Sequence, residues 1–193
     1  MNLLEGGQAG MIVRQTTKEL LAASIMELAR TKTVEKITVK EIVQNCGLTS
    51  TTFYHYFQDK YQLLAWIYNR KAEALFAEKD VIYTWPQLLR ALCAPLLEHP
   101  SFFANVFKNT AGQDSFSNKT MEYALALMIN RLREDNGGME LPSDIQFCLQ
   151  FYFRAIARTV NEWFVKGEPI PLDELVSLMD AAMPGPLEAY LRR

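Results

Sequence analysis

The segment at residues 49–57 carries a dense set of hydroxyl, phenol and imidazole groups. Phe53 and Phe57 are four residues apart, so they share one helix face, which we expect to pack on a core. The opposite face carries Ser50, Thr51, Tyr54 and His55. Such groups bind phosphate oxygens and base edges, and a threonine methyl packs against thymine. The same spacing is also typical of a surface helix with a solvated polar face, so both interpretations stand at this point.

Capping signals predict how this segment is positioned. Thr38 and Glu41 have the spacing of a capping box, and Ile37 with Ile42 forms the matching hydrophobic staple. Gly47 is expected to end that helix in a left-handed conformation, and Thr49 then caps the next helix. Two short helices joined by a tight turn form a helix-turn-helix, whose second helix lies in the DNA major groove.

Helical periodicity continues through the rest of the chain, and strand-like alternation is missing. The expected helices span residues 16–31, 38–46, 49–57, 59–79, 84–98, 101–110, 117–135, 142–166 and 172–183, followed by a short C-terminal turn. We therefore predict an all-α fold with a three-helix N-terminal head, a linking helix and a larger helical body. The predicted divisions are a loose tail at 1–13, a DNA-binding head at 14–60 and a regulatory and dimerisation body at 61–193.

The charge of the head is close to balanced. Residues 1–60 contain seven Lys/Arg and six Asp/Glu, and the whole chain has a net charge of -2 with a pI near 5.8. A basic patch therefore does not indicate nucleic-acid binding here. A DNA interface must depend on the geometry and type of its side chains.

Several other classes of protein are not indicated. The three cysteines are scattered, no metal-ligand cluster or cofactor motif occurs, and the two histidines belong to no catalytic set. We expect no catalytic residues, no cofactor and no metal, and therefore not an enzyme. No signal peptide or apolar run of about 18–20 residues is visible. A cytoplasmic protein without a membrane partner is expected.

Residues 38–64 resemble the N-terminal signature of the TetR family of transcription regulators. The matching features are the threonine-capped helix at Thr38, the glycine turn at Gly47, the aromatic run ending at Phe57, and Lys60 before the Leu63-Leu64 pair. The resemblance covers roughly residues 16–65. The body, with its turn at residues 167–172, resembles a subgroup that includes regulators of dihydroxyacetone kinase genes.

The resemblance implies roles for individual residues in binding double-stranded DNA. Ser50 and Thr51 take base-reading positions. Phosphate contacts are implied for Thr38, Thr52, Tyr54 and Lys60, and Lys40 is placed at the groove edge. His55 is placed to reach a base or the backbone, and Tyr56 to contact a phosphate or to pack. The reading face lacks Arg, Gln and Asn, so we predict modest base discrimination, with a larger part from DNA shape.

The helix at residues 143–166 is apolar on two faces and therefore needs two partners. One partner is its own core, and a second subunit is the other expectation, with residues 172–183 completing a four-helix bundle across a two-fold axis. The predicted dimer-interface residues are Ile145, Leu149, Ile156, Val160, Trp163, Leu175 and Met179, and Leu178 is expected to point inward. A merely buried central helix is the alternative interpretation.

Aromatic side chains in the body predict a cavity for a small effector, whose identity the sequence does not give. The residues assigned to it are Trp85, Phe103, Phe107, Phe147, Phe151 and Tyr152, with Phe102 nearby. These rings are also suited simply to fill a core. Asn105, Arg154 and Arg158 are polar in this apolar company and are placed either at a ligand or at the surface.

The predicted function is a regulator, with repression as the expected sign, that binds a palindromic operator as a homodimer and responds to a small molecule. A dimer reads two half-sites about 34–36 Å apart, or a multiple of this distance. The alternative is an adaptor of the same fold that acts through protein contacts, which the near-neutral head leaves open.

Overall fold

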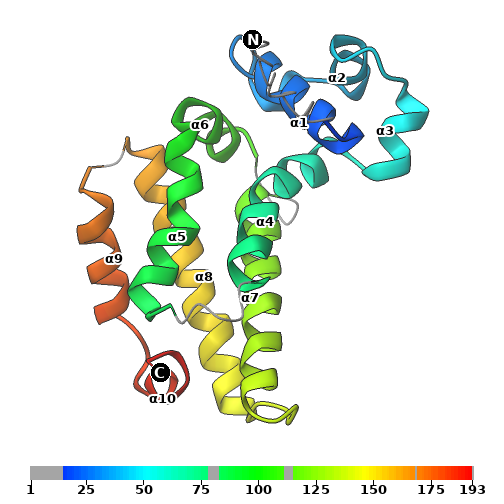
Figure 1. The fold of residues 1–193 in the computed structure, drawn as a ribbon. Coiled ribbons are helices and arrows are strands. Elements are labelled where there is room, and N and C mark those ends of the chain that lie inside the picture. The colour runs from blue at the N-terminus through cyan, green and yellow to red at the C-terminus, as the bar shows by residue number, and fades with distance from the viewer. Residues whose placement is uncertain (1–14, 78–82, 111–114, 168, 193) are drawn as a thin grey trace, which may run out of the picture.

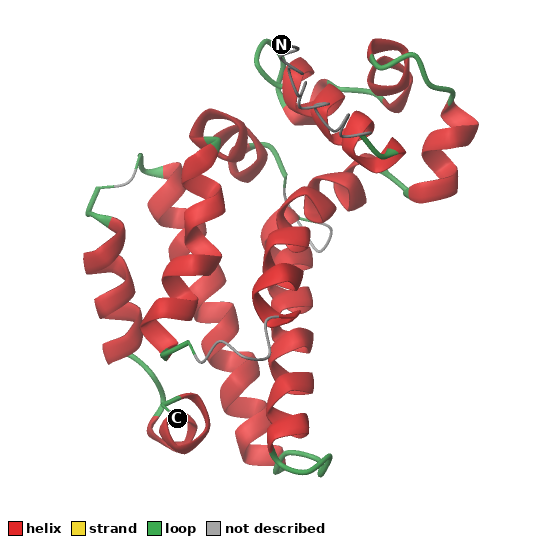
Figure 2. Ribbon diagram, viewed as in Figure 1, coloured by secondary structure: helices red, strands yellow, loops and turns green. Residues whose placement is uncertain are grey.

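The computed structural model describes residues 15–77, 83–110, 115–167 and 169–192. Within these ranges the chain forms α-helices and two short 3₁₀ turns, without a β-strand (Figure 2). The predicted all-α fold is confirmed. The predicted tail at residues 1–13 lies outside the described residues.

The helices lie close to the predicted ranges and form a head and a body joined by one helix (Figure 1). The head contains α1 (Thr17–Leu28), the 3₁₀ turn η1 (Val34–Lys36), α2 (Val39–Asn45) and α3 (Ser50–Tyr56). The joining helix is α4 (Lys60–Ala77). The body contains α5 (Trp85–Glu98), α6 (Pro100–Lys108), α7 (Phe116–Asp135), α8 (Ser143–Val165), α9 (Leu172–Ala181), η2 (Gly185–Leu187) and α10 (Glu188–Leu191).

Side-chain caps begin the helices of the head. The predicted capping box of α2 is present, since Thr38 accepts a hydrogen bond from the Glu41 amide while the Glu41 carboxylate accepts from the Thr38 amide. Thr16 and Glu19 form a second box at α1. Thr49 caps α3 by accepting from the Thr52 amide at 3.2 Å. These caps satisfy amides that helix geometry leaves without a partner, so each start is determined locally.

The core of the head is aliphatic and aromatic. Its fully buried members include Leu21, Ile25, Ile37, Ile42, Phe53 and Leu63. One polar group is buried among them: the Ser24 hydroxyl of α1 donates to the Ile42 carbonyl of α2 at 2.7 Å. Asn45 donates in turn to the Ser24 hydroxyl at 3.3 Å. The two helices are therefore joined by satisfied hydrogen bonds as well as by packing.

Long helices packed side by side form the body. α4 packs most extensively on α7, α7 packs on α8, and α5 packs on α9 (Figure 1). Because α4 also carries the head core residues Leu63 and Leu64, a single helix contributes to both parts of the molecule. The division of the chain at residue 60 remains a prediction, and its position lies at the first residue of α4.

The side chains predicted to meet a second subunit lie instead in the core of one chain. Ile145, Leu149, Val160, Trp163, Leu175 and Met179 are buried, and Ile156 is half-buried. They are covered by neighbouring helices of the same chain, for example where the Tyr152 hydroxyl donates to the Met179 carbonyl at 2.5 Å. This part of the interface prediction is wrong, because the face assigned to the partner is the face that packs inward.

The outward face of α8 carries two rings that were expected in a cavity. Phe147 is 68% exposed and Phe151 is 62% exposed, and their rings stack with centroids 6.4 Å apart. On α9, Leu178 is 57% exposed rather than inward. The face of α8 that was predicted to meet a partner is therefore buried, and the face with the two predicted cavity rings is exposed. The sequence does not distinguish the two faces, because both are hydrophobic.

We predict that Gly47→Ala lowers the free energy of unfolding by about 1 kcal/mol, because Gly47 has φ of 69° and a Cβ is strained in that conformation. No atom lies within 4 Å of the Cβ position, so the cost is purely conformational. Gly185→Ala is the matched control, since its Cβ also meets nothing and its φ is not positive. Urea unfolding of both variants tests this, and equal stability of the two would contradict it.

Candidate nucleic-acid interface and ligand cavity

The turn after α2 sets the direction of α3. The Leu48 amide donates to the Val43 carbonyl at 2.8 Å, and Gly47 supplies the left-handed residue between them. Phe53 is fully buried and Phe57 is 3% exposed, as the spacing predicted. Phe57 also packs against the Trp66 ring of α4, with centroids 5.9 Å apart. One side of α3 is therefore held against α1, α2 and α4.

The other side of α3 is open to solvent. Ser50, Thr51, Tyr54 and His55 are all exposed, as expected for a reading face. Tyr54 is 59% exposed and Tyr56 38% exposed, and the His55 and Tyr56 rings meet edge to face at 4.9 Å. The predicted hydroxyl, phenol and imidazole groups are thus exposed on α3, which lies at the outer side of the head in Figure 1.

The start of α2 lies beside this surface and carries a free cation. Lys40 is exposed and forms no ion pair with any residue that the structure describes. The Thr38 hydroxyl is also exposed, but it is already engaged with Glu41 in the capping box. Thr52 shares a hydrogen bond with Thr49 at 2.9 Å. Of these groups, Lys40 is the most directly available to a phosphate.

Lys60 is engaged inside the head. Its ammonium donates to the Glu35 carbonyl at 2.5 Å and to the Ile37 carbonyl at 2.7 Å. Burial lowers the pKa of Lys60, while the carboxylates of Glu35 and Glu41 oppose this. An ammonium has three donors, so one remains for a phosphate. Sequence reasoning missed the structural role, which joins the chain before α2 to the start of α4.

The Glu41 carboxylate lies at the start of α2, close to Lys40 in sequence. The hydrogen bond from Lys32, together with those from Thr38, lowers the pKa of Glu41 to about 2. Glu41 is therefore ionised at neutral pH, and its charge is offset by the ion pair with Lys32. This pairing explains why the near-neutral head can still present an uncompensated positive charge at Lys40.

Asn105 of α6 joins the body to the head. Its side-chain nitrogen donates to the carbonyls of Ala29 at 3.0 Å and Lys32 at 2.7 Å, and its oxygen accepts from the Val34 amide at 3.1 Å. Asn109 donates to the same oxygen at 3.0 Å and orients the amide. Asn105 is therefore neither a free surface group nor a ligand anchor.

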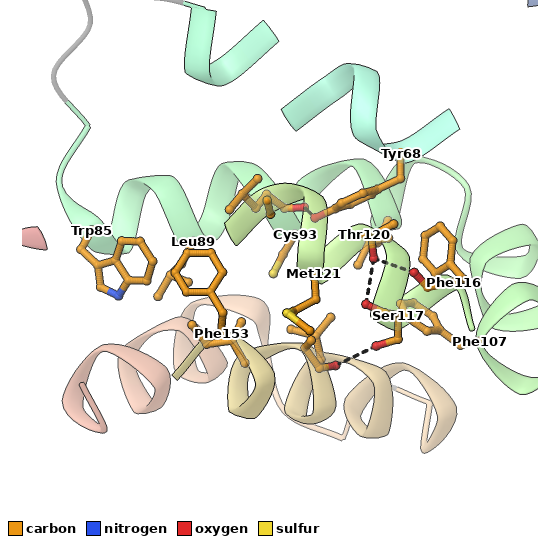
Figure 3. Close-up of a pocket in the computed structure, with 16 residues that line it drawn as sticks. Tyr68, Trp85, Leu89, Cys93, Phe107, Phe116, Ser117, Thr120, Met121 and Phe153 are labelled. Carbon is orange, nitrogen blue, oxygen red and sulfur yellow. Dashed lines mark hydrogen bonds between the residues drawn. The ribbon is translucent and has the colours of Figure 1, made fainter. Parts of the chain in front are cut away.

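A mostly apolar cavity lies in the body between α4, α5, α7 and α8 (Figure 3). It has a volume of about 70 Å³. Trp85 and Phe107 line it as predicted. Phe103 and Tyr152 are buried but do not line it. Phe147 and Phe151 are exposed on the outward face of α8. Sequence reasoning missed the contributions of Tyr68, Cys93, Thr120 and Met121, because these residues are spread over three helices.

The described residues that line the cavity include no charged side chain. Its polar groups are already bonded: the Tyr68 hydroxyl donates to the Leu92 carbonyl at 2.8 Å, and the Thr120 hydroxyl donates to the Phe116 carbonyl at 2.8 Å. Burial raises the pKa of the Cys93 thiol to about 12, so this cysteine is a neutral thiol. Such a wall favours an uncharged, apolar group.

The described residues contain no group of three or more His, Cys, Asp or Glu arranged to hold a metal ion. None of the helices within the described ranges is long and apolar enough to cross a membrane.

Known protein families match both the head and the body of this chain. Residues 20–67 match the description "Bacterial regulatory proteins, tetR family", and residues 83–185 match "Transcriptional regulator C-terminal region". The HTH-type dhaKLM operon transcriptional activator DhaS of Lactococcus lactis subsp. lactis (strain IL1403) is 29% identical over 91 residues, which are 47% of this chain. The matched region spans 49% of that relative's length.

Two solved structures share the fold. The dihydroxyacetone kinase operon activator DhaS has a TM-score of 0.57 and 23% identity, with 91% of this chain and 98% of that chain covered. A TetR transcriptional regulator from Rhodococcus sp. RHA1 has a TM-score of 0.63 and 16% identity, with 90% and 98% covered.

The head and body together define a helix-turn-helix transcription regulator rather than an enzyme. The chain belongs to the TetR family of bacterial DNA-binding regulators.

We predict that Asn105→Ala lowers the free energy of unfolding by about 1–3 kcal/mol, because the Val34 amide and two carbonyls lose their partner. Urea unfolding and amide hydrogen exchange at Val34 measure this. Lys108→Ala is the control, since Lys108 is exposed on the same helix and bonds to nothing in the described part of the head. Unchanged exchange at Val34 in Asn105→Ala would show that α6 does not hold the head.

Proposed function

We propose that this TetR-family regulator binds a palindromic operator as a homodimer and that a small molecule in the body controls its affinity for DNA. The observation that carries the proposal is the exposed polar face of α3, backed by two buried phenylalanines. The residues assigned to DNA are Thr38, Lys40, Ser50, Thr51, Thr52, Tyr54, His55, Tyr56 and Lys60. Ser50 and Thr51 read bases, and Thr38, Thr52, Tyr54 and Lys60 position the head on phosphates. Lys40 lies at the groove edge, His55 reaches a base or the backbone, and Tyr56 contacts a phosphate or packs.

The charge of the head supports a dimer. Two of the six described Lys and Arg side chains of the head are engaged within it, since Lys32 is paired with Glu41 and Lys60 is bonded to carbonyls, so a single head offers limited positive charge. Electrostatic contact with phosphates supplies much of the affinity for DNA, so one head binds weakly. Two heads on one operator double the contacts without a second loss of rotational and translational freedom.

The proposed dimer face lies on α8 and α9. Phe147 and Phe151 on α8 and Leu178 on α9 are large exposed apolar side chains on neighbouring helices. Ala155 and Ala181 are exposed beside them, and small residues allow two helices to approach closely. These residues replace the buried set predicted from sequence. A face of this kind marks an interface more often than a solvated surface.

Control by a small molecule is supported by the route from cavity to head. Phe107 lines the cavity, and Asn105, two residues earlier on α6, bonds to the backbone before α2. A ligand that displaces Phe107 therefore moves the helix that holds the head. The linkage is reciprocal, so such a ligand and DNA change each other's affinity by the same factor.

Repression is our proposal for the sign of regulation, since a dimer that covers a promoter blocks transcription through its DNA interface alone. The Lactococcus relative is named as an activator, which requires a further contact with the transcription machinery. A reporter on the operator decides between them, because deletion of the regulator raises expression under repression and lowers it under activation.

DNA binding is tested by fluorescence anisotropy with fragments from upstream of the chain's own gene, at 50 to 200 mM salt. Tyr54→Ala is expected to weaken binding to all fragments. Lys40→Ala is expected to weaken it and to flatten the slope of log K against log salt by about 0.9 for each subunit. Lys166→Ala, at the end of α8 in the body, is the control with unchanged binding. If the unaltered chain bound no fragment at low salt, the adaptor alternative would replace this proposal.

The dimer is tested by light scattering at micromolar concentration. The unaltered chain is expected at twice the chain mass of 22.1 kDa, and Phe151→Arg at the single-chain mass, because it places a charge in an apolar interface. Met139→Arg is the matched control, since Met139 is 63% exposed in the loop between α7 and α8. A single-chain mass for the unaltered protein would rule out the dimer.

A further inference from the structure

A second hollow adjoins the apolar cavity. It has a volume of about 370 Å³, lies between α7 and α8, and shares Phe107, Ser117, Met121 and Ala157 with the cavity wall. The two spaces are therefore separated only by these shared residues. The inner space is apolar, whereas the outer hollow is lined by polar side chains.

The described residues that line the outer hollow carry positive charge. Its lining includes Arg154 and Arg158 together with the amide side chains of Asn118 and Asn161, and no carboxylate among the described residues. Arg158 is paired with Glu162 at 2.7 Å. Arg154 is exposed and has no ion-pair or hydrogen-bond partner within the described part of the chain. A free guanidinium at a hollow is suited to bind a carboxylate through two parallel hydrogen bonds.

The boundary between the two spaces includes a long hydrogen bond between α7 and α8. The Ser117 hydroxyl donates to the Ala157 carbonyl at 3.5 Å, the outer limit for a hydrogen bond (Figure 3). Ala157 has only a methyl group there, and the unbranched Met121 side chain has three rotatable bonds. An alkyl chain can therefore pass between these residues at low cost.

We propose that the body binds an amphipathic anion, with a carboxylate at Arg154 in the outer hollow and an alkyl tail that enters the apolar cavity past Ser117, Met121 and Ala157. The inference rests on the small-molecule control proposed above and names the ligand class. The uncharged inner wall excludes a second charged group on the tail, because burying an unpaired charge is costly. The ligand is thus an anion at one end only.

Isothermal titration calorimetry with the full chain tests the assignment, using octanoate, octan-1-ol and octyltrimethylammonium below their micellar concentrations. Octanoate is expected to bind about tenfold more tightly than octan-1-ol or octyltrimethylammonium. Arg154→Gln is expected to reduce octanoate binding to the level of octan-1-ol and to leave octan-1-ol binding unchanged. Arg154 is exposed, so this substitution does not threaten folding.

Two further variants separate head and tail. Ala157→Leu narrows the passage and is expected to weaken octanoate and octan-1-ol alike. Arg133→Gln is the control with unchanged binding, because Arg133 pairs with Glu140 near the end of α7, away from the hollow. Equal binding of octanoate and octan-1-ol, a retained preference in Arg154→Gln, or no binding of any probe would overturn the assignment.

The proposed DNA function is tested separately. A chain that binds octanoate but no DNA would overturn the regulator function and leave the ligand class intact. A chain that binds DNA but no octanoate would overturn the ligand class and leave the regulator function intact.

Discussion

The burial of Phe53 and Phe57 is the interaction on which the proposed DNA-binding surface depends. α3 has seven residues, and a helix of that length is not stable by itself in water. Its stability comes from two rings packed against α1, α2 and α4, with the Thr49 cap satisfying its first turn. Once these rings are buried, the helix cannot rotate, so its opposite face must present Tyr54 and its neighbours to solvent.

The same constraint connects recognition to the body. α4 packs its first turns under the rings and its later turns along α7, so it is part of both cores. Asn105 adds a second connection through hydrogen bonds to the backbone between α1 and α2. A change in the body therefore reaches the head through one packed helix and one amide, both of which have defined positions. This arrangement gives the proposed ligand control a physical route, since coupling requires an element that both sites influence.

The body divides its functions around α8. The inward side of this helix closes the apolar cavity with Phe153 and Val160, and its outward side carries Phe147 and Phe151. Arg154 lies at the margin between α8 and α7, where it serves the outer hollow. One helix thus provides cavity wall, charged rim and proposed partner surface, and its length of 23 residues makes room for all three.

The sequence by itself determined the features that depend on near neighbours along the chain. The capping box at Thr38, the left-handed residue at Gly47 and the inward spacing of Phe53 and Phe57 involve groups within four residues of one another, and all were predicted correctly. Helix ranges and the polar face of α3 follow from the same local rules. These features were sufficient to indicate the family.

Only the tertiary structure decided the features that depend on distant contacts. It placed Lys60 on the carbonyls of Glu35 and Ile37, and it placed Asn105 on a backbone more than seventy residues away. The tertiary structure also determines which apolar face of α8 is buried. The hydrophobicity of a side chain predicts that it is buried, but not which neighbour covers it. The neighbour is determined by the packing of helices from different parts of the chain.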